Sequence, residues 1–388
     1  MMYCLINTID LKAYRGGDKI MKTTMEKNKM GFCIAGQKNK YYKKALKKEI
    51  LAMESSIVPK WPPSIDLHPI VISYINQKIT GITSSGEMAW IDMCVAKFKA
   101  VEKGLSLGTG TGRHEGAFLE KGFVERFDTI DLNTTSDKLL SDFSTKNIVG
   151  DLNFIQLPDK EYPLVIGCGV LHHIINLEHL LFSVNRTLTD DGLFIVFEYV
   201  GENKWQWEDS KMEIINSKLM DKFGSKYPNF KITKPPLWND RPFESIRSSD
   251  IPTLLRRYFG NTTEFEITMS GALYPIINTI MLSYRRDKLI NKPESLEEIL
   301  EFAVELDMEC ATHYKHLLPC YLFGIYRKSK IKKSISVQPW TNEKIRYELV
   351  PHLPFHKRTM KYLSRFSCLR KAYQFLTIAN RGIRRYYD

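Results

Sequence analysis

The stretch GLSLGTGTGRHEGAFLEKG, residues 104–122, decides the fold. Its apolar run Leu105–Leu107 predicts a strand that meets Gly108, Gly110 and Gly112, and the segment after these glycines has helical composition. Glycine is needed where a backbone turns tightly after a strand and approaches a ligand without a Cβ in the way. The stretch therefore predicts a strand, a glycine turn and a helix that together contact a ligand.

The spacing of the glycines narrows the class of ligand. Dinucleotide-binding proteins favour G-x-G-x-x-G, in which the helix N-terminus faces a pyrophosphate. This chain instead has the compact pattern G-x-G-x-G. Either pattern also occurs in plain glycine-rich turns, so the loop alone does not indicate a cofactor site. A second feature is needed.

An aspartate supplies that second feature. The segment FDTIDLN, residues 127–133, predicts the next strand and places Asp131 at its C-terminal end, 19 residues after Gly112. A carboxylate there accepts hydrogen bonds from both hydroxyls of a ribose and repels a 2′-phosphate. The alternative is an aspartate that only caps a turn in solvent. Together, the loop and the carboxylate predict a ligand that contains adenosine.

Short apolar runs and helical stretches alternate from about residue 66 onward, which indicates an α/β domain with a parallel sheet. The predicted strands are Gly104–Leu107, Phe127–Asp131, Asn147–Val149, Leu164–Cys168, Leu193–Tyr199, Glu264–Thr268 and Cys320–Tyr326. The predicted helices are His68–Thr80, Gly86–Ala100, 113–121, 136–145, 176–188, 208–223, 248–259, 272–284 and 294–316. A further helix is predicted near Lys38–Ser56.

Three later segments resemble the class I S-adenosylmethionine-dependent methyltransferases. In VGDLNFIQLP, Asp151 follows the third strand, where this family places an acidic residue near adenine. The segment YPLVIGCGVLHHIINLEHLL resembles the fourth strand and its "VLHH" turn, and NRTLTDDGLFIVFEYVG resembles the helix, turn and fifth strand. Residues 66–328 therefore resemble such a methyltransferase.

The segment YVG…WQW, residues 199–207, brings the resemblance closer to a bacterial group found among glycan and secondary-metabolite methyltransferases. Two positions depart from the family pattern. Tyr162–Pro163 stand where the family usually has an acidic residue, and Asp190–Asp191 replace the usual Pro–Gly of the turn before the fifth strand.

The resemblance implies a doubly wound, Rossmann-like sheet of seven mostly parallel strands with an antiparallel last strand, and S-adenosyl-L-methionine as the cofactor. The glycines would surround its methionine and ribose, Asp131 would hold the ribose hydroxyls, and Asp151 would lie beside the adenine. Gly169, Val170 and Leu171 would line the pocket floor. The implied cofactor-binding residues are Gly108, Thr109, Gly110, Gly112, Asp131, Leu132, Asp151, Leu152, Gly169 and Val170.

Candidate catalytic residues follow the fourth and fifth strands, at the edge where open α/β sheets bind ligands. His172 or His173 is a candidate general base, because imidazole titrates near neutrality; the alternative is a structural histidine in a common turn. Glu198 is a candidate base or substrate-orienting carboxylate. Trp205 and Trp207 are candidates for an apolar lid or a sugar-stacking wall, with ordinary packing as the alternative.

The segment CATHYKHLLPC contains Cys310, His313, His316 and Cys320, which are all potential metal ligands. Steps of three residues on a helix drift by about 60° each, so these side chains do not converge. We therefore predict no metal site.

The formal net charge of +12 is concentrated at the two ends of the chain. Residues 1–60 carry a net +8 and residues 330–388 a net +11, which leaves −7 for the body between them. We predict a basic N-terminal extension over 1–65, a methyltransferase domain over 66–328, and a basic, partly helical C-terminal extension over 329–388. The C-terminal run 356–386 has the profile of an interfacial helix that docks on a membrane surface or a partner protein; the alternative is packing on its own body.

Composition and cysteine usage indicate the cellular compartment in which the protein works. No stretch approaches the ~18–20 apolar residues of a transmembrane helix, and seven scattered cysteines without a CxxC pair indicate a reducing environment. We expect a cytoplasmic protein that docks at most peripherally on the inner face of the membrane. The sequence does not predict the oligomeric state.

The sequence therefore predicts an enzyme that methylates a small-molecule acceptor, first of all a hydroxyl of a sugar or glycan precursor. One alternative is a methyltransferase that acts on RNA or protein, although no RNA-reading module accompanies the basic ends. The other is a non-catalytic protein that binds an adenosyl or nicotinamide cofactor.

Overall fold

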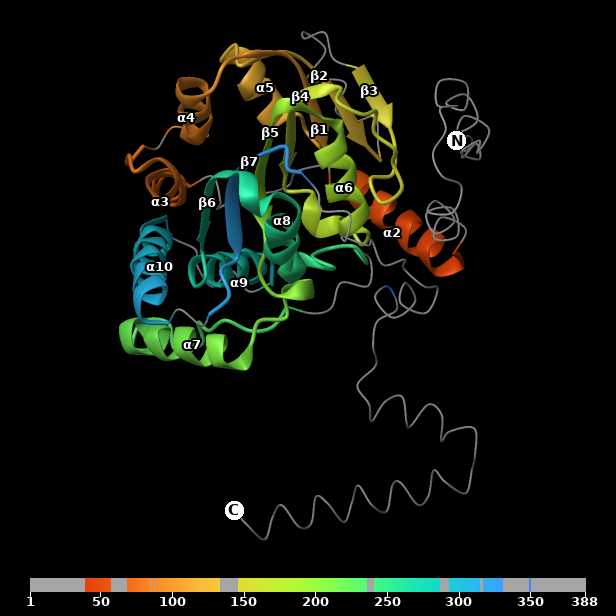
Figure 1. The fold of residues 1–388 in the computed structure, drawn as a ribbon. Helices are drawn as coiled ribbons and strands as arrows, with labels where there is room; N and C mark the ends of the chain where they lie inside the picture. Colours follow the sequence, from red (N-terminus) through yellow and green to blue (C-terminus); the bar gives the residue numbers. More distant parts are fainter. Residues whose placement is uncertain are drawn as a thin grey trace, which may run out of the picture.

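The computed structural model describes residues 39–56, 68–84, 86, 88–132, 146–235, 241–286, 293–314, 317–330 and 349. These residues form a seven-stranded sheet flanked by helices (Figure 1). The predicted helix 136–145 and nearly all of the predicted C-terminal extension, with its interfacial helix, lie outside the described residues.

The sheet has the strand order β3-β2-β1-β4-β5-β7-β6. Neighbouring strands from β3 to β5 are parallel, whereas β7 is antiparallel to both β5 and β6. This arrangement confirms the predicted doubly wound sheet with an antiparallel last strand. The strands are β1 (Val101–Leu107), β2 (Val124–Asp131), β3 (Lys146–Val149), β4 (Tyr162–Cys168), β5 (Leu188–Tyr199), β6 (Thr263–Met269) and β7 (Tyr321–Arg327).

The helices also lie close to their predicted positions. The one difference in type concerns residues 248–259, which form a 3-10 turn followed by a helix. The helices are α2 (Lys40–Ser56), α3 (Pro69–Thr80), α4 (Ala89–Lys97), α5 (Arg113–Glu120), α6 (Leu177–Thr187), α7 (Asp209–Phe223), α8 (Ile251–Phe259), α9 (Leu273–Arg286) and α10 (Pro293–His313). Short 3-10 turns are η4 (Leu171–His173), η5 (Asn203–Trp205), η6 (Ser248–Asp250) and η7 (Gly260–Thr262).

Strand β5 begins five residues earlier than predicted, at Leu188 rather than Leu193. The sequence analysis assigned Asp190–Asp191 to a tight turn because they stand where the methyltransferase family usually has Pro–Gly. In the structure they lie within the strand, where Asp191 is exposed and Asp190 pairs with Lys160 at 2.9 Å. A register shift against β4 accommodates this stretch.

Alternation along the central strands separates two apolar layers. Val165 of β4 belongs to the buried cluster that contains α6 and α8, while its neighbours Leu164 and Ile166 belong to the cluster that contains α4 and α5. Successive side chains of a strand point to opposite faces, so a strand that is apolar throughout is covered on both sides. Helices therefore sandwich the sheet, and the loops at its carboxyl edge are left to form a site.

A separate helical layer packs beyond the β6 and β7 end of the sheet. Apolar faces of α3, α7, α9 and α10 share one buried cluster. Within this layer, Asp307 of α10 holds the start of α9, because its Oδ1 accepts hydrogen bonds from the backbone N–H groups of Ala272 at 2.6 Å and Leu273 at 3.1 Å. Figure 1 shows this layer at the lower left of the molecule.

Helix α2 packs against the body of the molecule, although it belongs to the predicted N-terminal extension. Its Tyr42 and Ala45 are buried in one cluster with Phe154 and Ile175. The boundary at residue 65 stays a prediction about domains, but α2 supplies part of the core.

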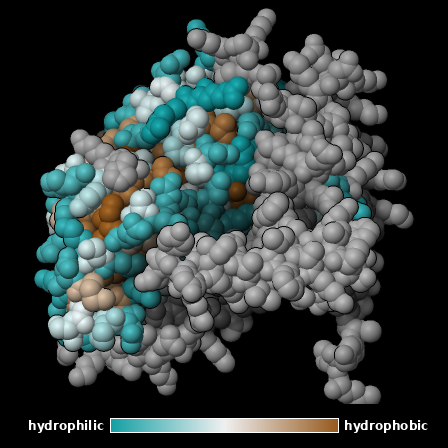
Figure 2. All heavy atoms as spheres, turned by 90° about the horizontal axis from the view of Figure 1, so that it is seen from below, coloured by the Kyte–Doolittle hydropathy of each residue, from teal (hydrophilic) through white to brown (hydrophobic). Residues whose placement is uncertain are grey.

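The surface seen from below mixes hydrophilic and hydrophobic residues, and the hydrophobic ones form separate groups on that face (Figure 2). Within the described part of the chain, no helix combines the length and apolar character needed to span a lipid bilayer.

Candidate active site

The glycine turn lies directly after β1, as predicted. Gly108 and Gly110 have φ angles of +63° and +56°, the left-handed region that favours glycine. A Cβ on Gly108 would lie 2.2 Å from Cγ2 of Val170, whereas a Cβ on Gly110 would meet nothing within 4 Å. Gly108 therefore lets the turn pack against the end of β4, and Gly110 borders open space.

Asp131 lies at the end of β2, beside the glycine turn. Its Oδ2 accepts a hydrogen bond from the backbone N–H of Gly110 at 2.9 Å. The parallel pairing of Leu107 with Ile130 explains this proximity, because it brings the carboxyl ends of β1 and β2 to the same level. Leu132 follows directly and is half-buried.

Asp151 follows β3 and is held by three hydrogen bonds. Its Oδ2 accepts from the hydroxyl of Tyr42 at 2.7 Å, and its Oδ1 accepts from the backbone N–H and the side-chain amide of Asn153 at 3.0 and 3.1 Å. Burial raises the pKa of Asp151, and these hydrogen bonds oppose the rise. Leu152 beside it is buried. The sequence analysis missed Tyr42, which lies in a lysine-rich helix without a motif.

Gly169 and Val170 follow β4 and complete this edge of the sheet. Gly169 has a φ of +68°, and its N–H donates to the carbonyl of Phe197 at 2.9 Å. Val170 packs over Gly108, as described above. Thr109 is buried, and its hydroxyl donates to Ser106 at 3.3 Å. The structure thus brings together the carboxyl ends of β1 to β4, where the predicted cofactor-binding residues lie.

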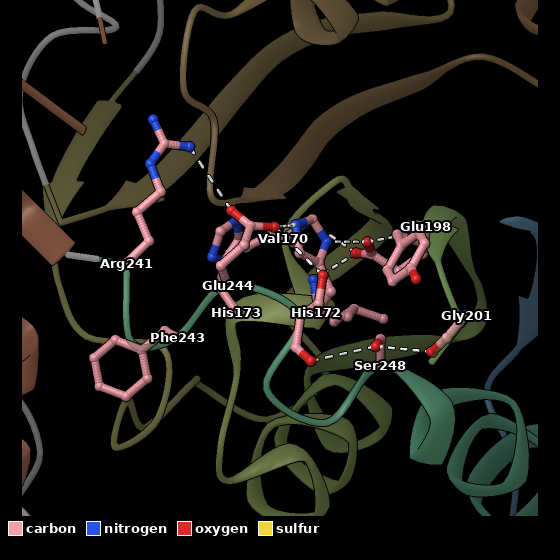
Figure 3. A network of polar contacts seen from close by, with 12 residues as sticks. Val170, His172, His173, Glu198, Gly201, Arg241, Phe243, Glu244 and Ser248 are labelled. Carbon is pink, nitrogen blue, oxygen red and sulfur yellow. Dashed lines mark hydrogen bonds and ion pairs between the residues drawn. The ribbon is translucent and has the colours of Figure 1, made fainter. Parts of the chain in front are cut away.

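Glu198 lies near the carboxyl end of β5, but its side chain points inward (Figure 3). It is fully buried, and its Oε2 accepts from the backbone N–H groups of Val170 at 2.8 Å and Leu171 at 2.5 Å. Its Oε1 accepts from the N–H of Tyr199 at 2.8 Å and lies 2.5 Å from Nδ1 of His172. Glu198 therefore fixes the η4 turn and the ring of His172, and it does not face an open site edge.

His172 lies between two carboxylates. Its Nδ1 faces Glu198, and its Nε2 lies 3.5 Å from Oε1 of Glu244. Burial opposes protonation of His172, but Glu198 and Glu244 outweigh it and raise the pKa to about 10. Burial likewise opposes ionisation of Glu244, but His173, His172 and Arg241 lower its pKa to about 2.

His173 lies against the ring of His172, with centroids 4.1 Å apart. Its Nδ1 is 3.4 Å from Oε1 of Glu49, a buried residue of α2 whose Oε2 accepts from the backbone N–H of Phe243 at 3.1 Å. The sequence analysis missed both Glu49 and Glu244, because no local pattern distinguishes them from surface glutamates. The two histidines and the three glutamates form one cluster, called here the histidine–glutamate cluster: His172, His173, Glu49, Glu198 and Glu244.

Glu115 is a buried carboxyl group beneath the glycine turn. It lies on α5, and its Oε1 accepts a hydrogen bond from the hydroxyl of Ser106. Burial raises the pKa of Glu115 to about 7, and the nearby charge of Asp131 adds to the rise. The sequence analysis did not single out this residue.

The tryptophans make packing contacts of the kind given as the alternative above. Trp207 is fully buried, and its ring lies 6.4 Å from that of Tyr199, while Trp205 is half-buried beside Tyr274. Cys310 and Cys320 are both buried. Among the residues that the structure describes, which exclude His316, the geometry of a metal site is found at His172, His173 and Glu244 and not in this segment.

A comparison with protein families gives a match to the methyltransferase domain over residues 105–196. The matched range runs from β1 into β5 and contains the glycine turn, Asp131, Asp151 and the η4 turn. Residues 105–196 form a methyltransferase domain. It is of the S-adenosylmethionine-dependent type, and S-adenosyl-L-methionine is its cofactor.

The sequence identity to individual proteins is low. The chain is 29% identical over 105 residues to a mitochondrial protein of Danio rerio named arginine-hydroxylase NDUFAF5, and the match covers 26% of this chain. The chain spans about a third of the length of that curated relative, 33%. A solved S-adenosylmethionine-dependent methyltransferase from Mesorhizobium loti aligns at 15% identity over 62% of this chain and 98% of its own, with a TM-score of 0.36. Phosphoethanolamine N-methyltransferase 2 of Haemonchus contortus aligns at 12% identity over 68% and 58%, with a TM-score of 0.38.

The site fits the cofactor of the matched domain. Open space beside Gly110 leaves room for a ligand against the backbone of the turn, and the half-buried carboxylate of Asp131 borders the same space. A vicinal diol is the group that a carboxylate at this strand end recognises. These residues therefore suit the ribose of an adenosyl cofactor.

Proposed function

We propose that the protein transfers the methyl group of S-adenosylmethionine to a small-molecule acceptor, first of all a hydroxyl of a sugar or glycan precursor. The observation that carries this proposal is the contact between Asp131 and the backbone of Gly110, at the edge of the matched methyltransferase domain. Support for a polar acceptor comes from the histidine–glutamate cluster, because its His172, His173 and Glu198 lie at the ends of β4 and β5 on the same edge of the sheet.

Each part of the cofactor has a proposed binding group. Gly108, Gly110 and Gly112 surround the methionine and ribose, Asp131 accepts from the ribose hydroxyls, and Asp151 lies beside the adenine. Thr109, Leu132, Leu152, Gly169 and Val170 line the remaining walls of this site.

The acceptor lies against the η4 turn in this proposal, where His172, His173 and Glu198 form the catalytic end. A sulfonium methyl is already electrophilic, so alignment of the nucleophile is the main task and supplies up to roughly 7–11 kcal/mol of the barrier. If the acceptor is a hydroxyl, removal of its proton by His173 adds about 10²–10⁴-fold. His172 has a pKa of about 10 and therefore holds a proton at neutral pH, so its role here is to orient the acceptor. Glu198 is a positioning residue here, because its oxygens already hold backbone N–H groups and His172.

Protein is the second candidate acceptor. It is favoured by one observation, the similarity to a relative whose name describes action on arginine. The acidic histidine–glutamate cluster also suits a basic side chain.

The experiment that tests the function begins with calorimetry of the full chain with S-adenosylmethionine and with NAD. Binding of the first and not of the second is expected, and the reverse would overturn the cofactor part of the proposal. Incubation with methyl-labelled S-adenosylmethionine then follows, with a panel of sugars, nucleotide sugars and arginine-containing peptides as acceptors. Label in the sugar fraction supports the first candidate, and label only in the peptide fraction supports the second.

A further inference from the structure

We propose that the histidine–glutamate cluster binds a divalent transition-metal ion through His172, His173 and Glu244. One ligand atom from each of these three side chains lies within 4.8 Å of the other two. Two imidazoles and a carboxylate are a donor set that holds zinc, cobalt, manganese or ferrous iron in proteins. The sequence analysis predicted no metal, because these three residues come together only in the fold.

The surroundings of His172 prepare it as a ligand. Its Nδ1 lies 2.5 Å from the buried Oε1 of Glu198, and its Nε2 points toward Glu244 (Figure 3). A metal-binding histidine typically donates its other ring N–H to a carboxylate, which fixes the tautomer and the ring orientation. Glu198, itself held by the backbone of the η4 turn, provides that second contact.

His173 gives an independent indication. Its Nδ1 is buried and has no hydrogen bond within the described residues. Oε1 of Glu49 lies 3.4 Å from this nitrogen, close enough for an ion pair but beyond the usual length of a hydrogen bond between these groups. A buried ring nitrogen without a hydrogen bond is costly unless another partner binds it, and a metal ion is a partner of the right chemistry.

The charge of the cluster also favours a dication. Glu49, Glu198 and Glu244 are 2%, 0% and 7% exposed, so their carboxylates are shielded from water. In the described part of the chain, the permanent cation that pairs with them is Arg241, 3.8 Å from Oε2 of Glu244. A metal ion binds imidazole in its neutral form, so the proton that His172 carries in the metal-free chain is released on binding. The three carboxylates and Arg241 then leave two negative charges, and buried carboxylates require paired charges or metals. One divalent ion balances them.

The inference deepens the proposed function without depending on it. A metal ion here would lie at the acceptor end of the site and could bind an acceptor oxygen, which makes a hydroxyl more acidic. Metal binding itself is measured without cofactor or acceptor. Its failure is therefore distinguishable from failure of the methyl-transfer proposal, which is judged by binding of S-adenosylmethionine.

The test titrates the full chain, freed of metal with a chelator, with Co²⁺ followed by optical absorption and with Zn²⁺ followed by calorimetry. We expect one ion per chain, visible Co²⁺ bands typical of four or five ligands, and displacement of Co²⁺ by Zn²⁺. Glu244→Gln, His172→Ala and His173→Ala should each weaken Zn²⁺ binding by about 100-fold or more, and Glu198→Gln by about 10–100-fold.

Controls separate a metal site from a cluster of ion pairs. His313→Ala removes an exposed histidine at the end of α10 and should leave Zn²⁺ affinity unchanged. Glu244→Gln keeps the side-chain shape, so it remains informative if the alanine variants fail to fold. Absence of stoichiometric binding at up to about 100 µM of either ion, or binding that Glu244→Gln leaves unaltered, would overturn the proposal.

Discussion

The hydroxyl of Tyr42 lies 2.7 Å from Oδ2 of Asp151, a contact that joins residues 109 positions apart. Tyr42 is 1% exposed, and its ring packs edge-on against Phe154 at a centroid distance of 5.1 Å. On the same helix, Glu49 faces His173. Helix α2 therefore contacts both the residue assigned to the adenine and the acceptor end of the site.

Replacement of Tyr42 tests this connection. Tyr42→Phe keeps the ring and removes one hydrogen bond to a buried carboxylate, so we expect the free energy of unfolding to fall by about 1–3 kcal/mol. Denaturation in urea measures it. The matched cycle adds Asp151→Asn and the double variant, whose effects should be non-additive by about 0.5–3 kcal/mol. Purely additive effects would mean that the two side chains do not interact in solution.

Asp131→Ala should weaken the binding of S-adenosylmethionine by about 100-fold, because two hydrogen bonds from ribose hydroxyls to a charged group are lost. Calorimetry provides the measurement. Asp92→Ala is the matched control, since Asp92 is an exposed aspartate of α4 that pairs with Lys121. Equal affinity of the Asp131 and Asp92 variants would remove Asp131 from the ribose site.

Much of the fold follows from local sequence pattern. The apolar runs that predicted the strands at Leu105, Val165 and Ile195 are buried on both faces of the sheet, and such strands are readable without tertiary information. The glycine turn and Asp131 were also predictable from local sequence, because strand ends and glycines at positive φ are local features.

The rest of the site depends on contacts between distant segments. Glu49 and the backbone of Phe243 are 194 positions apart, and neither segment carries a pattern that distinguishes a buried glutamate from an exposed one. Glu198 was assigned to the right strand end, but its inward orientation follows from the N–H groups of the η4 turn, which only the fold places beside it.

Alanine at the two glycines of the turn should have unequal costs. Gly110→Ala introduces a Cβ at positive φ into open space and should destabilise the fold by roughly 1–2 kcal/mol. Gly108→Ala adds a clash with Val170 and should cost about 1–3 kcal/mol more. Denaturation midpoints compare the two variants.

Val170→Ala provides the control for the clash at Gly108. It removes Cγ2, 2.2 Å from the new Cβ, but leaves the Cβ of residue 170 at 2.8 Å, so it should relieve part of the cost in the Gly108→Ala background. Equal costs for the two glycine variants would show that the turn does not pack on Val170 in solution.

Glu115 should make stability depend on pH in an unusual direction. Burial raises its pKa from 4.5 to about 7 in the folded protein. Between these values the folded state binds more protons than the unfolded state, so stability falls as pH rises and levels off above about pH 7. A shift of this size corresponds to about 3 kcal/mol.

Glu115→Gln mimics the protonated form, so its stability should not fall with pH in this way. Between pH 4.5 and 8, the free energy of unfolding of the variant should therefore rise by about this amount relative to that of the unmodified chain. Urea denaturation at several pH values measures the difference, with Glu120→Gln, an exposed glutamate of the same helix, as the control. A difference between the Glu115 variant and the unmodified chain that stays constant with pH would show that Glu115 is already ionised at pH 5.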